Sequence, residues 1–439
     1  MGVYYMEYER ILSKYQYAEL RIDNSANSVI SMRDDELTHS VGTSYGVSAR
    51  VFENGSWGFA SGNNEPIEEL LKMAQKLALL GKGRIKFDIP KQEKNTIEDK
   101  IKITDPEEQV SIILKSSKQM KAEKISSRNI TCIDSTNKGE FYNSHGTEIL
   151  QRIGYSYLSC TCIAKEGNNI QRGGARSSSR NGFDHLKIDS TMTESKEKAI
   201  RLLGADAPLK GRFMVVLDPE MTGVLCHEAI GHACEADAIV DKESILRDRI
   251  GHQIGNEMVT ITDDPTAKDF GNYHYDDEGI KAKKATLVQN GILKEYINSM
   301  ETAHELGIAT NGHARADGYD SSPIVRMSNT YFKPGKSSIE DVFEVRHGIY
   351  LKGMRGGSVD IFSGGFMFKA EEAYEIKNSE KGKLMHDVTI TGNILETLKN
   401  VECVGKDFGT SPGICGKGGQ EAPVSDGGPH IRLKDVAVG

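Results

Sequence analysis

The sequence has little of what several common protein classes require. Its 55 Lys and Arg residues are outnumbered by 63 Asp and Glu residues, and the formal net charge is −8. Because a chain without a basic excess is poorly suited to hold a polyanion, we expect no direct nucleic-acid binding. No apolar run approaches the roughly 18 residues of a membrane helix, so we expect no membrane association.

Other absences bear on the compartment and on the cysteines. The polar opening "MGVYYMEYERILSKYQYAELRID" lacks the apolar core of a signal peptide. The seven cysteines are odd in number and scattered, and no CxxC pair occurs among them. A disulfide framework is therefore not expected. We expect a cytoplasmic protein in which most cysteines are buried thiols and one is a candidate ligand.

The N-terminal half alternates helix and strand signals. Residues 4–16 predict a short helix, and "GVSARVF" and "WGFAS", joined through Asn54 and Gly55, predict a β-hairpin. A helix should begin near Pro66 and end near Gly81. Residues 88–104 are charged and linker-like. A second helix, "DPEEQVSIILKSSKQMKAEK", and a long antiparallel strand, "TEILQRIGYSYLSCTCIAK", follow.

The remaining segments complete the fold prediction. "IQRGGARSSSRNGF" is interpreted as a surface loop and "TMTESKEKAIRLLGA" as a helix. "GRFMVVLD" is a buried strand, "PEMTGVLCHEAIGHACEADAI" is a helix, and short strands and turns should dominate after Pro265. We predict an α+β protein. Residues 1–203 form an N-terminal α/β sandwich-like domain with antiparallel strands and a candidate internal boundary near 88–104. Residues 204–439 form a mostly β, barrel-like C-terminal domain with an embedded metal-binding helix.

The stretch "GVLCHEAIGHACEAD" contains two histidines, His227 and His232, five residues apart. In the zinc-protease motif His-Glu-x-x-His they are four apart. On a regular helix five residues turn the chain by about 140°, so the two imidazoles would not meet. The ordinary interpretation is an unrelated pair, with one histidine buried and the other exposed.

Three details favour a metal site instead. A π-bulge has an i→i+5 pattern and would bring the two histidines to one side. Gly231 removes a Cβ where the backbone would have to distort. Glu228 directly follows His227, in the position of the glutamate that takes a proton from the metal-bound water of zinc hydrolases. We therefore predict that the helix is not regular through His232.

A catalytic zinc site needs a third protein ligand beside an open position. The candidates are Glu235, three residues after His232, and Cys415 in "GICGKGGQ". Glycines on both sides would let a cysteine present its sulfur from a tight loop.

Several long motifs resemble one known family. The segments "CHEAIGHACEAD", "YDDEG", "PIVRMSNTYFKPGKSS", "GGSVDIFSGGFMFKAEEAYEI" and "GICGKGGQEAPV" occur in this order. They resemble the TldD subunit type of the TldD/TldE (PmbA) metallopeptidase family, once called modulators of DNA gyrase. The resemblance is dense from about residue 210 to the end and weaker over residues 10–200.

The resemblance implies a zinc peptidase that cuts unfolded or short peptides. It makes His227, His232 and Cys415 the Zn²⁺ ligands and Glu228 the general base and acid. It also implies a chamber formed with a second subunit, as a homodimer or as a heterodimer with a TldE-like paralogue. Because the distorted helix should swing Glu235 away from the metal, we predict that Glu235 holds a histidine tautomer instead. Peptides should bind as an added strand.

Further polar residues in the matched segments are candidates for substrate binding or oxyanion stabilisation: Arg315, Tyr319, Arg326, Asn329 and Arg355. For Arg326 and Asp360 a buried structural role is an equal alternative. The other histidines considered are not expected to be ligands: His252, His274, His304, His313, His347, His386 and His430. Two other functions compete. One is a non-catalytic regulator that binds an antitoxin or a gyrase-related partner, and the other is a structural zinc protein.

Overall fold

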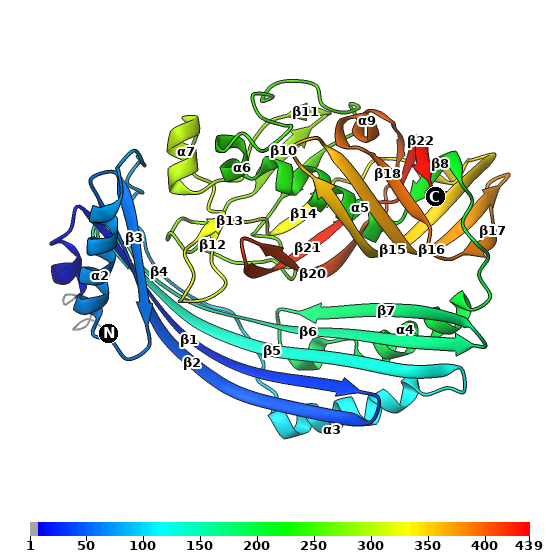
Figure 1. Ribbon diagram of the computed structural model, residues 1–439, viewed down its shortest axis with the longest axis horizontal. Coiled ribbons are helices and arrows are strands. Elements are labelled where there is room, and N and C mark those ends of the chain that lie inside the picture. The colour runs from blue at the N-terminus through cyan, green and yellow to red at the C-terminus, as the bar shows by residue number, and fades with distance from the viewer. Residues whose placement is uncertain (1–7) are drawn as a thin grey trace.

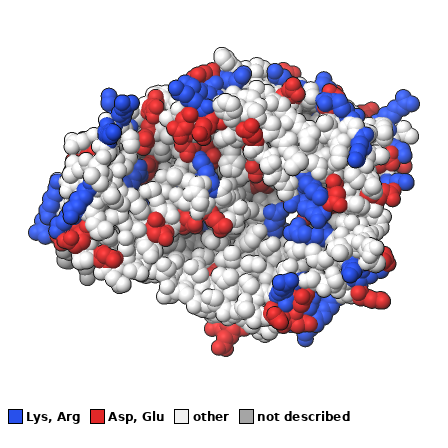
Figure 2. All heavy atoms as spheres, viewed as in Figure 1, with Lys and Arg blue, Asp and Glu red and all other residues white. Residues whose placement is uncertain are grey.

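A long curved sheet lies beneath a body of shorter strands in the computed structural model, which describes residues 8–439 (Figure 1). The sheet comes from the N-terminal half of the chain and the upper body from the C-terminal half. The same view in spheres shows a hollow between these two parts, with both acidic and basic side chains near its rim (Figure 2).

The curved sheet has seven strands in the order β3-β2-β1-β5-β6-β4, and β7 also pairs with β6. All neighbours are antiparallel except β4 and β6. The strands are β1 (Tyr17–Arg33), β2 (Glu36–Glu53), β3 (Ser56–Gly62), β4 (Lys94–Glu98), β5 (Ile125–Asn143), β6 (Glu148–Glu166) and β7 (Asn169–Ser179).

Three helices cover parts of this sheet: α2 (Ile67–Leu80), α3 (Pro106–Ser117) and α4 (Ile188–Leu202). Short 3₁₀ turns lie at Lys118–Met120 and Phe183–His185. Figure 1 shows α3 and α4 on the face that points away from the upper body. Ile113 of α3 and Met192 of α4 pack there with Leu158 and Cys160 of β6 in one buried cluster. This apolar layer leaves the opposite face of the sheet turned toward the hollow.

Several local predictions are confirmed. Asn54 and Gly55 both have positive φ, 50° and 79°, as a two-residue hairpin turn between β2 and β3 requires. Helix α2 begins after Pro66 and ends at Gly81. Of the helix predicted over residues 4–16, residues 8–12 are helical, while residues 4–7 lie outside the described part of the chain.

Two predictions in this half are wrong. The linker predicted at 88–104 contains β4, which adds to the sheet beside β6. The predicted surface loop contains β7, which pairs with β6 over its whole length. Its glycines serve packing, because a Cβ on Gly173 would overlap the backbone of α4 at Ser195 and Ala199. Because packing against α4 requires small side chains, this strand lacks the alternation of apolar and polar residues that would have predicted it.

The upper body contains two larger sheets and one two-stranded sheet. Its strands are β8 (Gly211–Leu217), β9 (Ile261–Asp263), β10 (Ala285–Gln289), β11 (Ile292–Leu293), β12 (Ala314–Arg315), β13 (Ile324–Val325), β14 (Asn329–Phe332), β15 (His347–Asp360), β16 (Gly365–Lys377), β17 (Glu380–Met385), β18 (Thr389–Asn393), β19 (Val401–Val404), β20 (Gly409–Lys417), β21 (Gln420–Gly428) and β22 (Ile431–Val438). Its α-helices are α5 (Pro219–Val224), α6 (Ala236–Val240), α7 (Met300–Leu306), α8 (Ile339–Val342) and α9 (Ile394–Lys399).

One of these sheets is barrel-like. Its strands follow the order β15-β8-β22-β18-β16, and pairing between β15 and β16 closes the ring. The predicted α+β class with a barrel-like C-terminal part is thus confirmed, although β15 and β16 are longer than the short strands expected after Pro265. The division of the chain at residue 203 stays a prediction.

The other sheet has the order β11-β10-β9-β14-β21-β20, so that β20 lies at its edge. Strand β20 also contacts β7 of the curved sheet. The segment from α5 onward packs into the apolar core that these two sheets share, which includes Leu225 and Ile230. Within residues 8–439, no helix has both the length and the apolar character needed to cross a bilayer.

Gly223 of α5 packs closely against β21, and a substitution at this position tests that contact. A Cβ at Gly223 would overlap the backbone of Gly427 in β21. We expect Gly223→Ala to lower the free energy of unfolding by about 1–3 kcal/mol, the usual cost of overpacking a close contact. Urea unfolding followed by circular dichroism measures it. Gly42→Ala is the control, since nothing lies within 4 Å of a Cβ there. Equal midpoints for the two variants would contradict the close approach of α5 and β21.

Candidate metal centre

The two histidines lie on a helix whose first turn is fixed by the barrel. Strand β8 leads into Asp218, whose carboxylate accepts the backbone N–H of Met221 at 2.9 Å and caps α5. The same carboxylate accepts the N–H of Gly353 from β15 at 3.1 Å. Pro219 occupies the first helical position, where a backbone N–H would have no acceptor within the helix, so the missing N–H of proline costs nothing. The start of the helix is therefore held to a neighbouring strand.

The helix then widens. Residues Leu225–Gly231 form a π-helical turn, in which the N–H of His232 bonds to the carbonyl of His227 five residues earlier. A 3₁₀ turn, His232–Cys234, and α6 follow. The predicted departure from regular α-helix is confirmed. The two imidazole rings meet in a T-shaped, edge-on contact, with centroids 5.1 Å apart and planes at 88°.

The surroundings of Gly231 explain why the turn carries a glycine. A Cβ on Gly231 would overlap Sδ of Met327, which lies just before β14. The φ of Gly231 is −55°, so its role is to allow close approach and not to supply a left-handed conformation.

Cys415 comes to the same place from β20. The candidate ligand atoms of His227, His232 and Cys415 all lie within 4.8 Å of one another, and Sγ of Cys415 is 3.6 Å from Nε2 of His232. Cys415 is paired with Ala422 inside the β20–β21 ladder. The predicted tight loop is therefore wrong, because the turn falls later, at Gly418 and Gly419, which both have positive φ.

The charges in this cluster favour a thiolate. Burial alone would raise the pKa of Cys415, but hydrogen bonds and charge from His227 and His232 outweigh burial and lower it to about 5. Cys226, by contrast, is buried without such partners, and burial raises its pKa. A thiolate is the form in which cysteine binds metals.

The residues fit a metal ion. Nδ1 of His227 is buried and has no hydrogen-bond partner among the described residues. A buried ring nitrogen normally has a partner, and this one belongs to a residue that lies beside two other candidate donors. Two imidazoles and one thiolate form a donor set that suits zinc, with room for a fourth position.

Glu235 supports this cluster from outside. Its Oε2 lies 3.0 Å from Nδ1 of His232 and 3.1 Å from Nζ of Lys417. Lys417 also forms an ion pair with Asp237 at 2.6 Å. Because Glu235 binds the far nitrogen of the His232 ring, it is placed to orient that imidazole. That Glu235 is not itself a ligand stays a prediction.

Glu228, unlike Glu235, has a carboxylate without a protein partner among the described residues. The residue is half-buried, and its carboxylate makes no hydrogen bond or ion pair to any of residues 8–439. Glu228 directly follows His227 on the π-turn, and a carboxylate without a protein partner is available to exchange protons with a bound molecule.

Two nearby residues were missed by the sequence reasoning. Asp426 of β21 has a buried, unpartnered Oδ1, and burial raises its pKa to about 7, with Glu228 and Glu220 acting in the same direction. Arg176 of β7 donates to Glu220 at 2.9 Å and interacts electrostatically with Asp426. Neither Asp426 nor Arg176 lies in a sequence motif that is typical of metal sites. Only the pairing of β20 with β21 and the contact of β7 with β20 bring them here.

The structure places two of the predicted substrate-binding residues inside the protein. Arg326 is 1% exposed and donates to the carbonyls of Cys415 and, at 3.1 Å, Gln420. Asn329 is fully buried and accepts the N–H of Gly271 at 2.9 Å. These contacts favour a structural role over contact with substrate for both residues.

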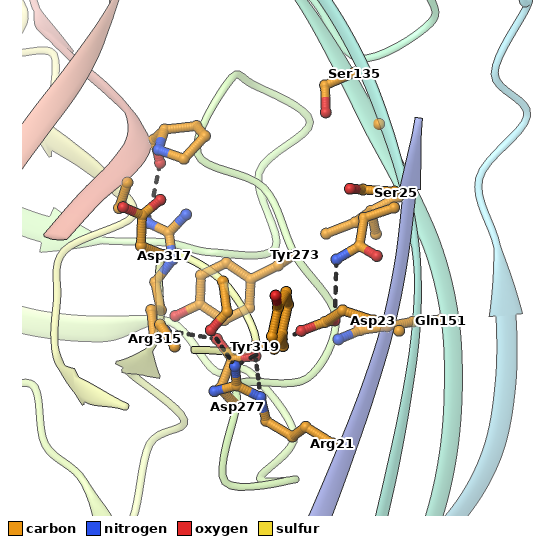
Figure 3. A pocket seen from close by; sticks show the side chains of 18 of the residues that line it. Arg21, Asp23, Ser25, Ser135, Gln151, Tyr273, Asp277, Arg315, Asp317 and Tyr319 are labelled. Atoms are coloured by element: carbon orange, nitrogen blue, oxygen red, sulfur yellow. Dashed lines mark hydrogen bonds and ion pairs between the residues drawn. The ribbon is translucent and has the colours of Figure 1, made fainter. Parts of the chain in front are cut away.

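The other candidates are dispersed. Arg315 and Tyr319 line a cavity beside β21, in which their side chains project toward Tyr273 and Asp277 (Figure 3). Arg355 forms an ion pair with Asp387 at 3.0 Å. Asp360 is exposed and caps a turn by accepting the N–H of Phe362 at 3.0 Å, so the alternative of a buried partner is wrong for it.

None of the histidines expected not to be ligands joins a group of metal donors in residues 8–439: His252, His274, His304, His313, His347, His386 and His430.

Three sequence profiles of one family match the chain. PmbA/TldA metallopeptidase domain 1 matches residues 18–79, the central domain matches 96–203 and the C-terminal domain matches 210–439. A protein of Methanothermobacter thermautotrophicus named metalloprotease is 40% identical over 98% of this chain and 96% of its own length. A zinc metalloprotease TldD homolog of Saccharolobus solfataricus is 32% identical over 96% of both chains.

Solved structures share the fold at low identity. TldE from Thermococcus kodakarensis is similar with a TM-score of 0.84, at 19% identity over 99% of both chains. A putative modulator of DNA gyrase from Thermotoga maritima is similar with a TM-score of 0.82, at 19% identity over 100% of both chains.

Two substitutions distinguish a ligand from its support. Cys415→Ala should abolish stoichiometric zinc binding, because it removes one of three converging donors. Glu235→Gln should weaken binding by about 10- to 100-fold, because the amide still accepts a hydrogen bond from the His232 ring. Metal content after dialysis against a competing chelator, measured by mass spectrometry, decides between them. A greater loss in Glu235→Gln than in Cys415→Ala would overturn the assignment.

Proposed function

The chain belongs to the PmbA/TldD family of metallopeptidases, and we propose that it is a zinc peptidase that hydrolyses unfolded or short peptides. One observation carries this proposal: the donor atoms of His227, His232 and Cys415 converge within 4.8 Å, and the carboxylate of Glu228, on the same π-turn as His227, has no partner among the described residues. A binding protein would have no use for a proton acceptor next to three metal donors.

In this proposal His227, His232 and Cys415 hold the ion. Zinc bound there would supply Lewis acidity, lowering the pKa of water and polarising the scissile carbonyl. The low pKa of Cys415 makes the thiolate the form of this ligand at neutral pH. Glu235 keeps the His232 ring in position through its bond to Nδ1.

Glu228 would act as the proton carrier. It would accept a proton from the attacking water and pass it to the amine that leaves, so that a neutral amine departs. Its position directly after His227 puts it on the same widened turn. Asp426 adds a second acidic group nearby, and its raised pKa keeps part of that group protonated near neutral pH.

We further propose that the peptide binds as an extended strand. Strand β20, which carries Cys415, lies at the edge of its sheet, and β7 pairs only with β6 among the described strands. The two strands are in contact, so unpaired backbone groups of both border the same region. Backbone pairing would give affinity with little demand on side-chain sequence.

A second subunit would complete the chamber in this proposal, either a copy of this chain or a TldE-like paralogue. Support comes from the hollow between the two halves, which is open on the face seen in Figure 2. An enclosing partner would exclude folded proteins by size.

Removing the proton carrier tests the chemistry. Glu228→Gln should keep zinc but cut an unstructured polypeptide roughly 100- to 10,000-fold more slowly, the usual contribution of a general acid–base group. Chelation should abolish cleavage by the parent protein. Initial rates are measured by mass spectrometry of the products, with the chain alone and with its paralogue added. Glu344→Gln, at an exposed glutamate, is the control.

Cleavage that survives both chelation and Glu228→Gln would contradict a zinc peptidase. A protein that binds zinc stoichiometrically but cuts nothing with either partner would favour the alternative of a non-catalytic regulator.

The strand-binding proposal has its own test. The folded, disulfide-bonded form and the reduced, unfolded form of one small protein are offered together at equal concentration. We expect the unfolded form to be cut at least about tenfold faster, because only an extended chain can pair with a strand edge. Disappearance of each form is followed by mass spectrometry. Equal rates would show that an enclosed strand-binding cleft is the wrong picture.

A further inference from the structure

A cavity of about 560 Å³ lies between the curved sheet and the β20–β21 hairpin. Asp23, Ser135 and Gln151 of the sheet line one side, while Tyr273 and Arg315 of the upper body line the other (Figure 3). The cavity is polar, and nothing in the metal centre accounts for its residues. It borders β21 at Glu421–Pro423, the stretch that pairs with the strand carrying Cys415.

Arg180, directly after β7, has an unsatisfied guanidinium at this cavity. Its side chain is 11% exposed, and Nε and Nη2 are buried without a hydrogen-bond partner. The one carboxylate paired with it is that of Asp99, at 3.8 Å, which is too long for a hydrogen bond. The other oxygen of Asp99 is taken by His274 at 2.9 Å. A buried guanidinium N–H without a hydrogen-bond acceptor costs free energy. A ligand that accepts hydrogen bonds from Arg180 would therefore be stabilised at this position.

The surroundings of Arg180 add positive charge. Arg315 lines the same cavity and donates only to carbonyls, those of Met327 at 2.7 Å and Pro423 at 2.9 Å. Burial lowers the pKa of Arg180 to about 10, and the charge of Arg315 acts in the same direction. Within residues 8–439, neither of these two guanidinium groups has a hydrogen-bonded carboxylate.

Several acidic groups of the cavity are engaged by other partners. Arg21 lies 3.7 Å from both Asp23 and Asp277. Asp277 also accepts the N–H of Ala316 at 2.8 Å, and Asp317 accepts the N–H of Glu421 at 3.2 Å. Asp320 and Glu421 also line the cavity, but among the described residues neither forms an ion pair with Arg180, whose buried donors therefore remain without an acceptor.

We infer that Arg180 binds the C-terminal carboxylate of a peptide that lies along β7. The planar fork of an arginine matches a carboxylate in two parallel hydrogen bonds. The identification of the anion as a peptide terminus rests on the proposed function. Arg176, next to Glu220 beside the metal centre, precedes Arg180 by four residues, about 13 Å along an extended chain. An extended peptide of about four residues would span that distance.

Binding is measured without cleavage, by calorimetry on the zinc-loaded Glu228→Gln protein. The probes are N-acetylated tetra-alanine as the free acid and as the amide, with inorganic phosphate as competitor. We expect the acid to bind roughly tenfold or more tightly than the amide, because hydrogen bonds to charged groups are worth more than neutral ones. Arg180→Gln should bring the ratio close to one. Arg172→Gln, on the same strand but outside the cavity lining, should leave it unchanged.

Equal affinity of acid and amide in the parent protein, or an undiminished ratio in Arg180→Gln, would overturn the inference. Phosphate that displaces the peptide at equal concentration would overturn it too, in favour of a general anion site. If Arg180→Gln does not fold, the acid-to-amide ratio of the parent and the phosphate competition decide. No cleavage enters these measurements, so a failed peptidase assay and a failed carboxylate site remain distinguishable.

Discussion

A single hydrogen bond, from the N–H of His232 to the carbonyl of His227, decides whether the candidate ligands can meet. On a regular helix the second imidazole would lie about 140° away from the first. The i→i+5 bond widens the turn and brings the two rings to a centroid distance of 5.1 Å. A π-turn is less favourable than α-helix, so its presence requires compensation elsewhere. That compensation is burial, since Leu225, Ala229 and Ile230 all lie in the core shared by the two sheets.

The position of Cys415, the third candidate ligand, depends on cationic side chains that bind the backbone carbonyls of its hairpin. Cys415 is brought to the histidines by the β20–β21 hairpin, whose carbonyls accept hydrogen bonds from Arg326 and Arg315. Lys417 ties the same strand to Val325 at 2.9 Å and to Glu235. Because Glu235 in turn holds His232, the helix and the hairpin are linked by two routes, the candidate metal and this ion-pair chain.

The sequence was informative where one short segment decides the geometry. The spacing of His227 and His232, with Gly231 beside them, predicted the π-turn, and Asn54-Gly55 predicted its hairpin. The sequence was not sufficient where a segment takes its structure from another segment that is distant in the chain. Strand β7 lacks the hydrophobic alternation of a strand because Gly173 must admit α4 and because Arg176 reaches Glu220 of the upper body. The strand position of Cys415 likewise depends on pairing with β21.

Strand edges explain why the proposed peptide path lies where the two halves of the chain meet. An unpaired edge on an outer surface is an aggregation hazard. Here the free edges of β7 and β20 belong to different sheets and contact one another, so each restricts access to the other. In the proposed function, an extended peptide would pair with one of these edges, whereas a folded protein would not reach it. The edge that carries Cys415 would in this way keep its pairing capacity for a chain that passes beside the metal donors.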